Sequence, residues 1–247
     1  MKTQVSPAII IRVREIKESD LLVTFFAREN GLLRGVAKGA RRSLKRFVNC
    51  FETFSLVNLE YETRRENASC FLLSGKLQHA FQGLRKDFTA LGRASYMIEL
   101  TELLFPPGVS EPRMFDLLKD GLNALSEGEG SPAIALAFEL RAMALGGYRI
   151  NLERCCCCGR SYKGEGLAVF IPEQGTVACT KCRQPSAIHP SMGPETVKAI
   201  ARLQTGSLCE SAPQDLTETI LEEISGILKL HRDYRLEQKL RTGKYME

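Results

Sequence analysis

Nine cysteines occur in this 247-residue chain, and six of them are concentrated in residues 155–182. Cys155 and Cys158 form one CxxC pair, and Cys179 and Cys182 form a second pair after 20 intervening residues. A CxxC turn offers two thiolates to one ion, and two such turns supply the four sulfur ligands of a closed, tetrahedral structural zinc site. The spacing therefore predicts one Zn²⁺ ion held by these four cysteines.

Two further cysteines, Cys156 and Cys157, lie inside the first pair and leave its register open. The outer residues are favoured because only Cys155 and Cys158 have the two-residue gap of a zinc knuckle. Ordinary reduced thiols and a redox CxxC are the alternatives, but two pairs at ribbon spacing favour a metal, with iron as a substitute for zinc. Segments 167–171 and 176–178, between the pairs, are expected to form a short hairpin.

Positive charge is concentrated near the N-terminus. The 34 Lys and Arg exceed the 29 Asp and Glu by only five, yet residues 1–50 contain 11 basic against four acidic residues. Residues 34–47, called the basic segment below, include six cations and no acid: Arg34, Lys38, Arg41, Arg42, Lys45 and Arg46. Mobile cations on a glycine-containing segment suit binding to phosphates. We expect a nucleic-acid interface here, and a solvated charged loop is the alternative.

Three phenylalanines, Phe47, Phe51 and Phe54, lie at the end of the basic segment and just after it. Aromatic rings beside cations stack on bases in some proteins, but each of these rings is individually expected in the core. The three histidines are expected at the surface or as capping residues, and Glu99 and Glu102 on an exposed helix face. The sequence contains no phosphate-binding glycine loop and no nucleophile–base constellation, so it does not support an enzyme.

The N-terminal region has the composition of short strands. Runs rich in Ile, Val, Phe, Thr and Leu cover residues 8–15, 21–27, 32–38, 53–61 and 70–78, and a charged turn is expected at 63–67. Five strands with no long helix among them predict a small closed barrel of the OB type, which tolerates one long connection. The basic segment is expected to form that connection or the end of the third strand.

From residue 87 the apolar pattern has the period of α-helices. Helices are expected at 87–105, 112–127, 133–145, 194–203 and 216–240. The predicted fold class is therefore α+β. It comprises a five-stranded OB-fold barrel in residues 1–80 and an α-helical domain in residues 81–247, interrupted by an inserted zinc finger at 152–185.

Two classes of protein are excluded by composition. No apolar run approaches the ~18 residues needed to span a membrane, because the longest candidate, residues 133–145, contains Glu139 and Arg141. The first residues also lack the apolar core of a signal peptide. We therefore expect a cytoplasmic protein whose cysteines are reduced rather than paired in disulfides.

The order of these motifs resembles that of the bacterial RecO recombination-repair proteins over essentially the whole chain. The resemblance rests on GLLRGVAKGARR at 31–42, RF at 46–47, ETFSL at 52–56, NLERCCCCG at 151–159, the second CxxC pair and HRDYRL at 231–236. It implies an OB-fold, a helical domain and a four-cysteine zinc finger. Carried over to this sequence, DNA binding falls on the six cations of the basic segment, and zinc binding on Cys155, Cys158, Cys179 and Cys182.

The same resemblance implies a function without an active site. It implies binding to single- and double-stranded DNA, annealing of complementary strands and association with the nucleoid. It further implies that the protein, with RecR, loads the recombinase RecA onto DNA coated by single-strand-binding protein, whose acidic C-terminal tail is expected on helices in residues 87–145. A zinc-ribbon RNA-binding module of the transcription or translation apparatus and a redox enzyme are the alternatives.

Overall fold

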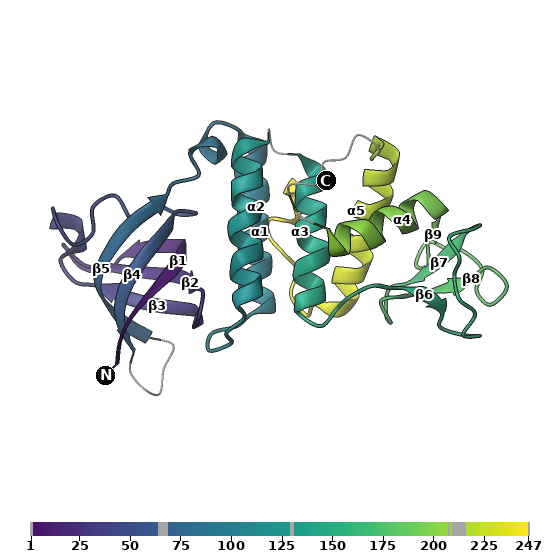
Figure 1. Cartoon of the computed structure of the whole chain (residues 1–247), viewed down its shortest axis with the longest axis horizontal. Helices are drawn as coiled ribbons and strands as arrows, with labels where there is room; N and C mark the ends of the chain where they lie inside the picture. Colours follow the sequence, from purple (N-terminus) through teal and green to yellow (C-terminus); the bar gives the residue numbers. More distant parts are fainter. Residues whose placement is uncertain (1, 64–68, 129–130, 207, 209–215, 247) are drawn as a thin grey trace.

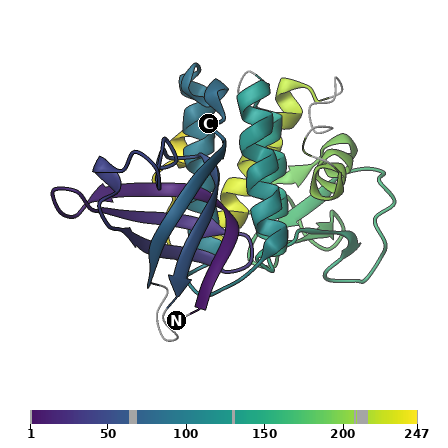
Figure 2. The same ribbon diagram turned by 60° about the vertical axis from the view of Figure 1, so that its left-hand side comes forward.

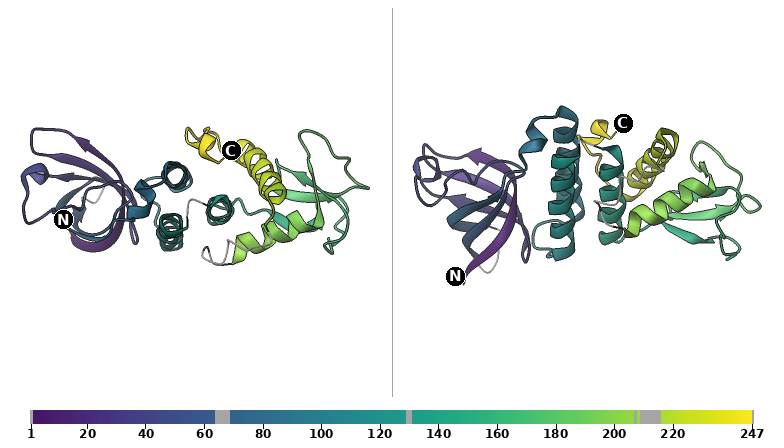
Figure 3. Two further views of the ribbon diagram at one scale, coloured as in Figure 1. Left: turned by 90° about the horizontal axis from the view of Figure 1, so that it is seen from above. Right: turned by 45° about the horizontal axis from the view of Figure 1, so that its top comes forward.

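The computed structural model describes residues 2–63, 69–128, 131–206, 208 and 216–246. Three parts follow one another along the long axis of the molecule (Figure 1): a five-stranded barrel, a group of helices and a small sheet. The view from above in Figure 3 has the same order, with the helices between the barrel and the small sheet. The α+β prediction is therefore confirmed.

The barrel closes through five strands in the order β1-β2-β3-β5-β4. Their bounds are β1 (Lys2–Glu15), β2 (Leu21–Ala27), β3 (Gly31–Ala37), β4 (Leu56–Thr63) and β5 (Ser69–His79). β1 pairs with β2 on one side and with β4 on the other, and the parallel pairing of β3 with β5 completes the ring. Figure 2 shows the long β1 curving around the barrel. The predicted OB-like barrel is confirmed.

Two strand boundaries differ from the prediction by three residues or more. β1 begins at Lys2 rather than residue 8, because its polar first half forms the ladder with β4, in which Val5 lies opposite Glu60. β4 begins at Leu56 rather than residue 53. The chain between β3 and β4 is a long connection that contains most of the basic segment and a single 3₁₀ turn, η1 (Ala40–Arg42). The charged turn expected at 63–67 lies, apart from Thr63, outside the described residues.

The outer face of β1, β2 and β3 packs against the helices. Ile9, Phe26 and Leu32 lie directly opposite one another across these three strands, so their side chains share one face. All three are buried in the same apolar cluster as the helices. The barrel is thus fixed to the helical part by a flat apolar row rather than by a flexible linker.

Three helices that pack against one another follow the barrel: α1 (Phe88–Leu104), α2 (Pro112–Glu127) and α3 (Pro132–Leu145). The side chain of Asp87 caps α1 by accepting a hydrogen bond from the backbone N–H of Thr89 at 2.8 Å. Pro112 and Pro132 occupy the first turns of α2 and α3, where a missing N–H costs nothing. The predicted starts of these helices are therefore confirmed.

Two later helices, α4 (Pro194–Thr205) and α5 (Glu218–Arg235), pack on α3. α5 ends at Arg235, so the predicted extension of this helix to residue 240 is wrong. The chain instead turns back, and the carboxylate of Glu99 on α1 accepts hydrogen bonds from the backbone N–H groups of Arg241 and Thr242 at 3.0 and 2.9 Å. Among the described helices, none has the length and apolar character required to cross a membrane.

The small sheet contains β6 (Asn151–Cys155), β7 (Ala168–Ile171), β8 (Thr176–Cys179) and β9 (Ser191–Met192), in the order β6-β8-β7-β9. β7 and β8 form the predicted antiparallel hairpin. Phe170 and Met192 are buried in the apolar cluster that also holds the helices and the barrel face. A single apolar cluster therefore runs from the barrel to this sheet.

The sequence predicted His231 at the surface or as a capping residue, but the side chain is fully buried on α5. Its Nε2 is 2.8 Å from the carbonyl oxygen of Tyr148, and its ring meets that of Phe170 edge-on at 5.8 Å. Gly175, in the turn of the β7–β8 hairpin, approaches the His231 ring so closely that a Cβ atom would lie 2.7 Å from Cε1. His231 therefore anchors the small sheet to α5.

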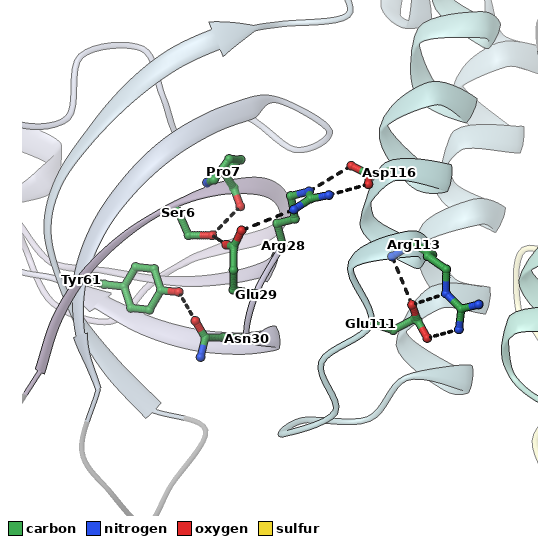
Figure 4. A network of polar contacts seen from close by, with 9 residues as sticks. All are labelled: Ser6, Pro7, Arg28, Glu29, Asn30, Tyr61, Glu111, Arg113 and Asp116. Atoms are coloured by element: carbon green, nitrogen blue, oxygen red, sulfur yellow. Dashed lines mark hydrogen bonds and ion pairs between the residues drawn. The ribbon is translucent and has the colours of Figure 1, made fainter.

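Two contacts fix the barrel to α2 and the loop that precedes it. Gly31 has a φ of 65°, and a Cβ atom at this position would lie only 1.9 Å from the carbonyl oxygen of Val109. Arg28 makes a bidentate contact with Asp116 on α2, at 3.1 and 2.9 Å, and Figure 4 shows it reaching across the junction. Glycine is required at position 31 because both the backbone conformation and the close approach exclude a side chain.

Candidate nucleic-acid interface and metal centre

The four outer cysteines converge at one end of the small sheet. The Sγ atoms of Cys155, Cys158, Cys179 and Cys182 all lie within 4.8 Å of one another. β6 and the turn after it supply the first pair, and the end of β8 and its turn supply the second. Gly159, with φ of 69°, allows the first turn to fold back, and its N–H donates to the carbonyl oxygen of Cys155 at 2.9 Å.

The electrostatics of this cluster suit a cation. Desolvation raises the pKa of the Cys155 thiol, but hydrogen bonds from backbone N–H groups, that of Cys179 first, outweigh it and lower the pKa to about 6. The side chain of Cys179 raises the pKa of Cys182 to about 12. Neighbouring thiols that oppose one another's ionisation in this way become four thiolates together only beside a positive ion. The cluster could thus hold one metal ion.

Cys156 and Cys157 are exposed and stand outside the cluster, with their own Sγ atoms 3.7 Å apart. The turn that begins at Cys155 carries both side chains away from the other pair. The geometry therefore favours Cys155 and Cys158, rather than either middle cysteine, as the ligands from the first pair.

The tip of the basic segment lies on the barrel beside the β1–β2 turn. The N–H of Gly39 donates to the Asp20 carboxylate at 2.8 Å, and the N–H of Arg41 donates to the carbonyl oxygen of Ser19 at 3.1 Å. Further on, the N–H of Gly75 donates to the carbonyl oxygen of Arg46 at 2.8 Å. The segment is thus held at both ends by backbone contacts, and its six cations are exposed. The guanidinium group of Arg46 folds back and donates to the carbonyl oxygen of Lys38 at 2.8 Å.

Its cations have weak or no acidic partners. Arg41 pairs with Glu15 at 2.9 Å and Arg42 with Glu18 at 3.6 Å, and all four side chains are largely exposed. Such surface pairs contribute about 0–1 kcal/mol, so a phosphate can replace the carboxylate at little cost. Lys45 has no ion-pair partner within the described residues. A groove of about 570 Å³ separates Lys45 and Arg46 from β4 and β5.

Arg34 does not lie with the other predicted DNA-binding cations. It is exposed on the outer face of β3, at the boundary with the helices, where it lines a separate cleft together with Arg12 and Arg14. Lys38 lies between the two regions and is 5.3 Å from the centre of the Phe71 ring. Strand periodicity would have separated Arg34 from Arg41, Arg42, Lys45 and Arg46, because the strand ends at Ala37.

The phenylalanines near the segment are part of the core, as expected. Phe47 and Phe54 are 5% and 7% exposed, and Phe51 is half-buried with its ring 5.0 Å from that of Phe47. The exposed apolar side chain is instead Leu44, at 90%, in the middle of the cations. Its exposure could not be predicted from the sequence, because a lone leucine among cations carries no periodic signal. It is available to contact bases, whereas the phenylalanine rings are not free to stack.

A pocket of about 560 Å³ lies between α2, α3 and the end of α4. We call it the arginine pocket, because its lining combines three arginines and three leucines with a single acid, Asp120: Arg113, Arg141, Arg149, Leu117, Leu145 and Leu208. Arg113 makes a bidentate contact with Glu111 at the start of α2 (Figure 4), and the Nε of Arg141 donates to the carbonyl oxygen of Leu203 at 2.7 Å. The pocket therefore offers charged and apolar contacts to one ligand.

Comparisons with known proteins agree across the chain. The family model described as "Recombination protein O N terminal" matches residues 1–81, and the one described as "Recombination protein O C terminal" matches residues 85–244. Similar curated proteins include "DNA repair protein RecO" of Geobacter metallireducens, 33% identical over 88% of both chains. The proteins of the same description from Syntrophobacter fumaroxidans and a Nocardioides species are 39% identical over 72% of this chain and 71% of theirs, and 31% identical over 97% of each.

Proposed function

The chain belongs to the recombination protein O (RecO) family of DNA repair proteins, and we propose that it is a recombination mediator that binds single- and double-stranded DNA and anneals complementary strands. The observation that supports this proposal is the basic segment, which is held on a closed barrel by its backbone and keeps its cations exposed, with at most weak surface ion pairs to displace. We propose that it performs no chemical reaction on DNA and requires no nucleotide.

Annealing follows from holding two strands by their phosphates. Cations at Arg41, Arg42, Lys45 and Arg46 reduce the repulsion between two bound backbones, and binding raises the local concentration of the strands. Because the phenylalanine rings are committed to the core, the bases remain free to pair with each other. Contacts of this kind position a strand without reading its sequence.

We propose that the cysteine cluster holds one structural zinc ion, through Cys155, Cys158, Cys179 and Cys182. The ion would neutralise the crowded thiolates and fix the two turns of the small sheet. The four sulfurs leave no open position, so its role would be structural, and none of the steps proposed for DNA passes through it.

We further propose that the arginine pocket receives the acidic C-terminal tail of single-strand-binding protein. Arginines surrounding leucines suit a peptide that carries both carboxylates and apolar side chains. Binding of this tail would bring the protein to DNA coated by single-strand-binding protein, where with RecR it would help to load RecA. RecR and RecA are proposed as partners on the basis of the family to which the chain belongs.

The DNA-binding proposal is tested with a double variant, Arg42→Ala with Lys45→Ala, against a control with the same charge change, Lys119→Ala with Lys198→Ala on α2 and α4. Affinity for a labelled single strand is measured by fluorescence anisotropy at several salt concentrations. We expect the slope of log K against log salt to fall by about 1.4, at about 0.7 per phosphate. An unchanged slope in the first variant, or an equal loss in the control, would contradict the proposal.

The arginine pocket has its own test. Arg149→Ala should weaken binding of a peptide with the sequence of the tail, and should slow annealing of coated strands while leaving annealing of bare strands unchanged. Equal annealing of coated strands by the variant and the wild type would place the tail elsewhere.

A further inference from the structure

A second cluster of cations lies at the junction between the barrel and the helices, outside the basic segment. It lines a cleft of about 820 Å³, called the junction cleft here. The barrel contributes Arg12, Arg14 and Arg34, α1 contributes Glu99 and Glu102, and the C-terminal segment, residues 236–246, contributes Lys239 and Arg241. The yellow C-terminal segment appears behind the barrel in Figure 2.

The register of the barrel explains why the cations gather there. The apolar row of Ile9, Phe26 and Leu32 packs on the helices, and the next row on the same face is Arg12, Thr24 and Arg34. Rows two residues apart along β2 and β3 share one face. On β1 a bulge between Ile10 and Arg12 adds one residue, which brings Arg12, three residues after Ile9, opposite Thr24. The sheet therefore changes from apolar to basic at the boundary where the helices stop covering it, and Arg14 continues the basic surface by one more row.

The acids of the cleft are already engaged. Glu102 pairs with Arg12 at 3.0 Å, and Glu99 accepts the hydrogen bonds that hold the C-terminal segment. Within the described part of the chain, Arg14, Arg34 and Lys239 have no acidic partner at all. The cleft thus carries five cations against two acids, and three of the cations lack counter-charges.

Contacts with α1 hold the C-terminal segment in place, so that its cations have defined positions in the cleft. Tyr245 packs on Gly92 of α1, where a Cβ atom would lie 2.6 Å from the tyrosine ring, and its ring centre is 6.0 Å from that of Phe88. With the Glu99 contacts, this fixes residues 241–245 on α1 and leaves Lys239 exposed beside the barrel. The C-terminal segment, which turns back instead of continuing α5, thus forms one wall of the cleft.

The two basic surfaces lie at the same end of β1. Glu15, the neighbour of Arg14, pairs with Arg41 of the basic segment. We infer that the junction cleft is a second phosphate-binding site for DNA, in which a strand held by the basic segment continues past Arg14 and Arg34 to Lys239 of the C-terminal segment. This inference rests on the proposed binding of DNA by the basic segment and extends the path of the strand onto the helical domain.

The test is the double variant Arg14→Ala with Lys239→Ala, which removes two exposed and unpaired side chains and therefore leaves the fold intact. Its affinity for a labelled single strand of about 30 nucleotides is measured against salt, beside the variant of the basic segment and the Lys119→Ala, Lys198→Ala control. We expect the salt slope to fall by about 1.4 and the affinity at 0.1 M salt to fall roughly 20-fold, at about 0.7 per phosphate. The control should match the wild type.

The three variants separate the two proposals. If the cleft variant binds like the wild type while the variant of the basic segment loses affinity, the junction cleft is not on the DNA path, and its charge is then to be tested against acidic proteins. If neither variant loses affinity, the proposed DNA interface itself is wrong. Loss in both variants, with none in the control, is the result that supports a path across both surfaces.

Discussion

The guanidinium group of Arg232 on α5 lies 2.8 Å from the carboxylate of Glu139 on α3, in the interior of the helical domain. Glu139 is 1% exposed, and Arg232 also donates to the hydroxyl of Tyr96 on α1 at 2.8 Å. Three helices therefore meet at one buried ion pair. Burial raises the pKa of Glu139 above its ordinary value, and the charge of Arg232 opposes that shift.

Replacing Arg232 alone should be strongly destabilising. Arg232→Met leaves the buried carboxylate without its counter-charge, and we expect the free energy of unfolding to fall by about 3–5 kcal/mol. Urea denaturation measures the loss. The double variant Arg232→Met with Glu139→Leu should recover most of it, because no buried charge then remains. A double variant no more stable than Arg232→Met would mean that packing, rather than charge, dominates.

The loss in Arg232→Met should depend on pH. Without the arginine, burial alone acts on Glu139 and its pKa rises further. A carboxyl whose folded pKa exceeds its unfolded value binds protons more tightly when folded, so stability increases as pH falls through the folded value. We expect the deficit relative to the wild type to be smaller near pH 5 than near pH 7. A deficit that is constant with pH would contradict this.

Gly31 allows a direct comparison of two kinds of strain. Gly31→Ala places a methyl group against the carbonyl oxygen of Val109, whereas Gly147 has a similar positive φ, 88°, with nothing within 4 Å of the added carbon. We expect Gly147→Ala to cost about 1–2 kcal/mol for the left-handed backbone alone, and Gly31→Ala to cost about 3 kcal/mol or more. Thermal melting of both variants measures the loss of stability. Equal losses would show that the junction between the barrel and the helices rearranges to accommodate the methyl group.

The geometry of the cysteine cluster predicts which cysteines are required for metal binding. Cys158→Ser should abolish binding of the proposed zinc ion, while Cys157→Ser, one residue away and outside the cluster, should retain it. Metal content per chain after dialysis against a weak chelator distinguishes the two. Retention by Cys158→Ser together with loss by Cys157→Ser would shift the ligand register by one residue. Because the cluster is remote from the barrel, DNA binding by Cys158→Ser should be largely preserved.

The C-terminal segment should loosen in acid. Desolvation raises the pKa of Glu99, but hydrogen bonds from Thr242 and from the backbone N–H of Arg241 outweigh it and lower the pKa below its ordinary value. The contribution of such a carboxylate is present above its unfolded pKa and is lost as pH falls through the folded value. We expect the amides of Arg241 and Thr242 to lose protection against hydrogen exchange, relative to their intrinsic rates, as the pH falls below the ordinary pKa of a glutamate.

Glu99→Gln provides the matched control for that experiment. The amide still accepts hydrogen bonds through its oxygen but does not titrate in this range. Protection at Arg241 and Thr242 should therefore be lower at neutral pH in the variant and nearly independent of acid. If the variant kept the pH dependence of the wild type, a different group would be responsible.

Local patterns in the sequence predicted most of the elements, since prolines, an N-terminal cap and apolar periods mark the starts of the helices. They did not predict where α5 ends. Its apolar pattern continues through Leu236 and Leu240, but these side chains pack after the chain has turned back on α1. The reversal depends on Glu99 and Gly92, which are far away in the sequence, so no local pattern reports it.

The candidate site divides in the same way. The spacing of the cysteines indicated the cluster, because a short turn determines that geometry locally. In the sequence the basic segment is continuous. In the structure Arg34 lies apart from Arg41, because Arg34 is on β3, at the boundary with the helices. His231, expected at the surface or as a capping residue, is instead buried, since its burial depends on the close approach of Gly175 in a distant hairpin.

The single apolar cluster that runs from the barrel through the helices to the small sheet has a mechanical consequence. Packed protein interiors have low compressibility and transmit displacement, and this cluster is not interrupted by a flexible linker. The barrel, the helices and the small sheet should therefore move together as one rigid unit. A partner that binds to the small sheet would then be held at a fixed distance from DNA bound, as proposed, on the barrel.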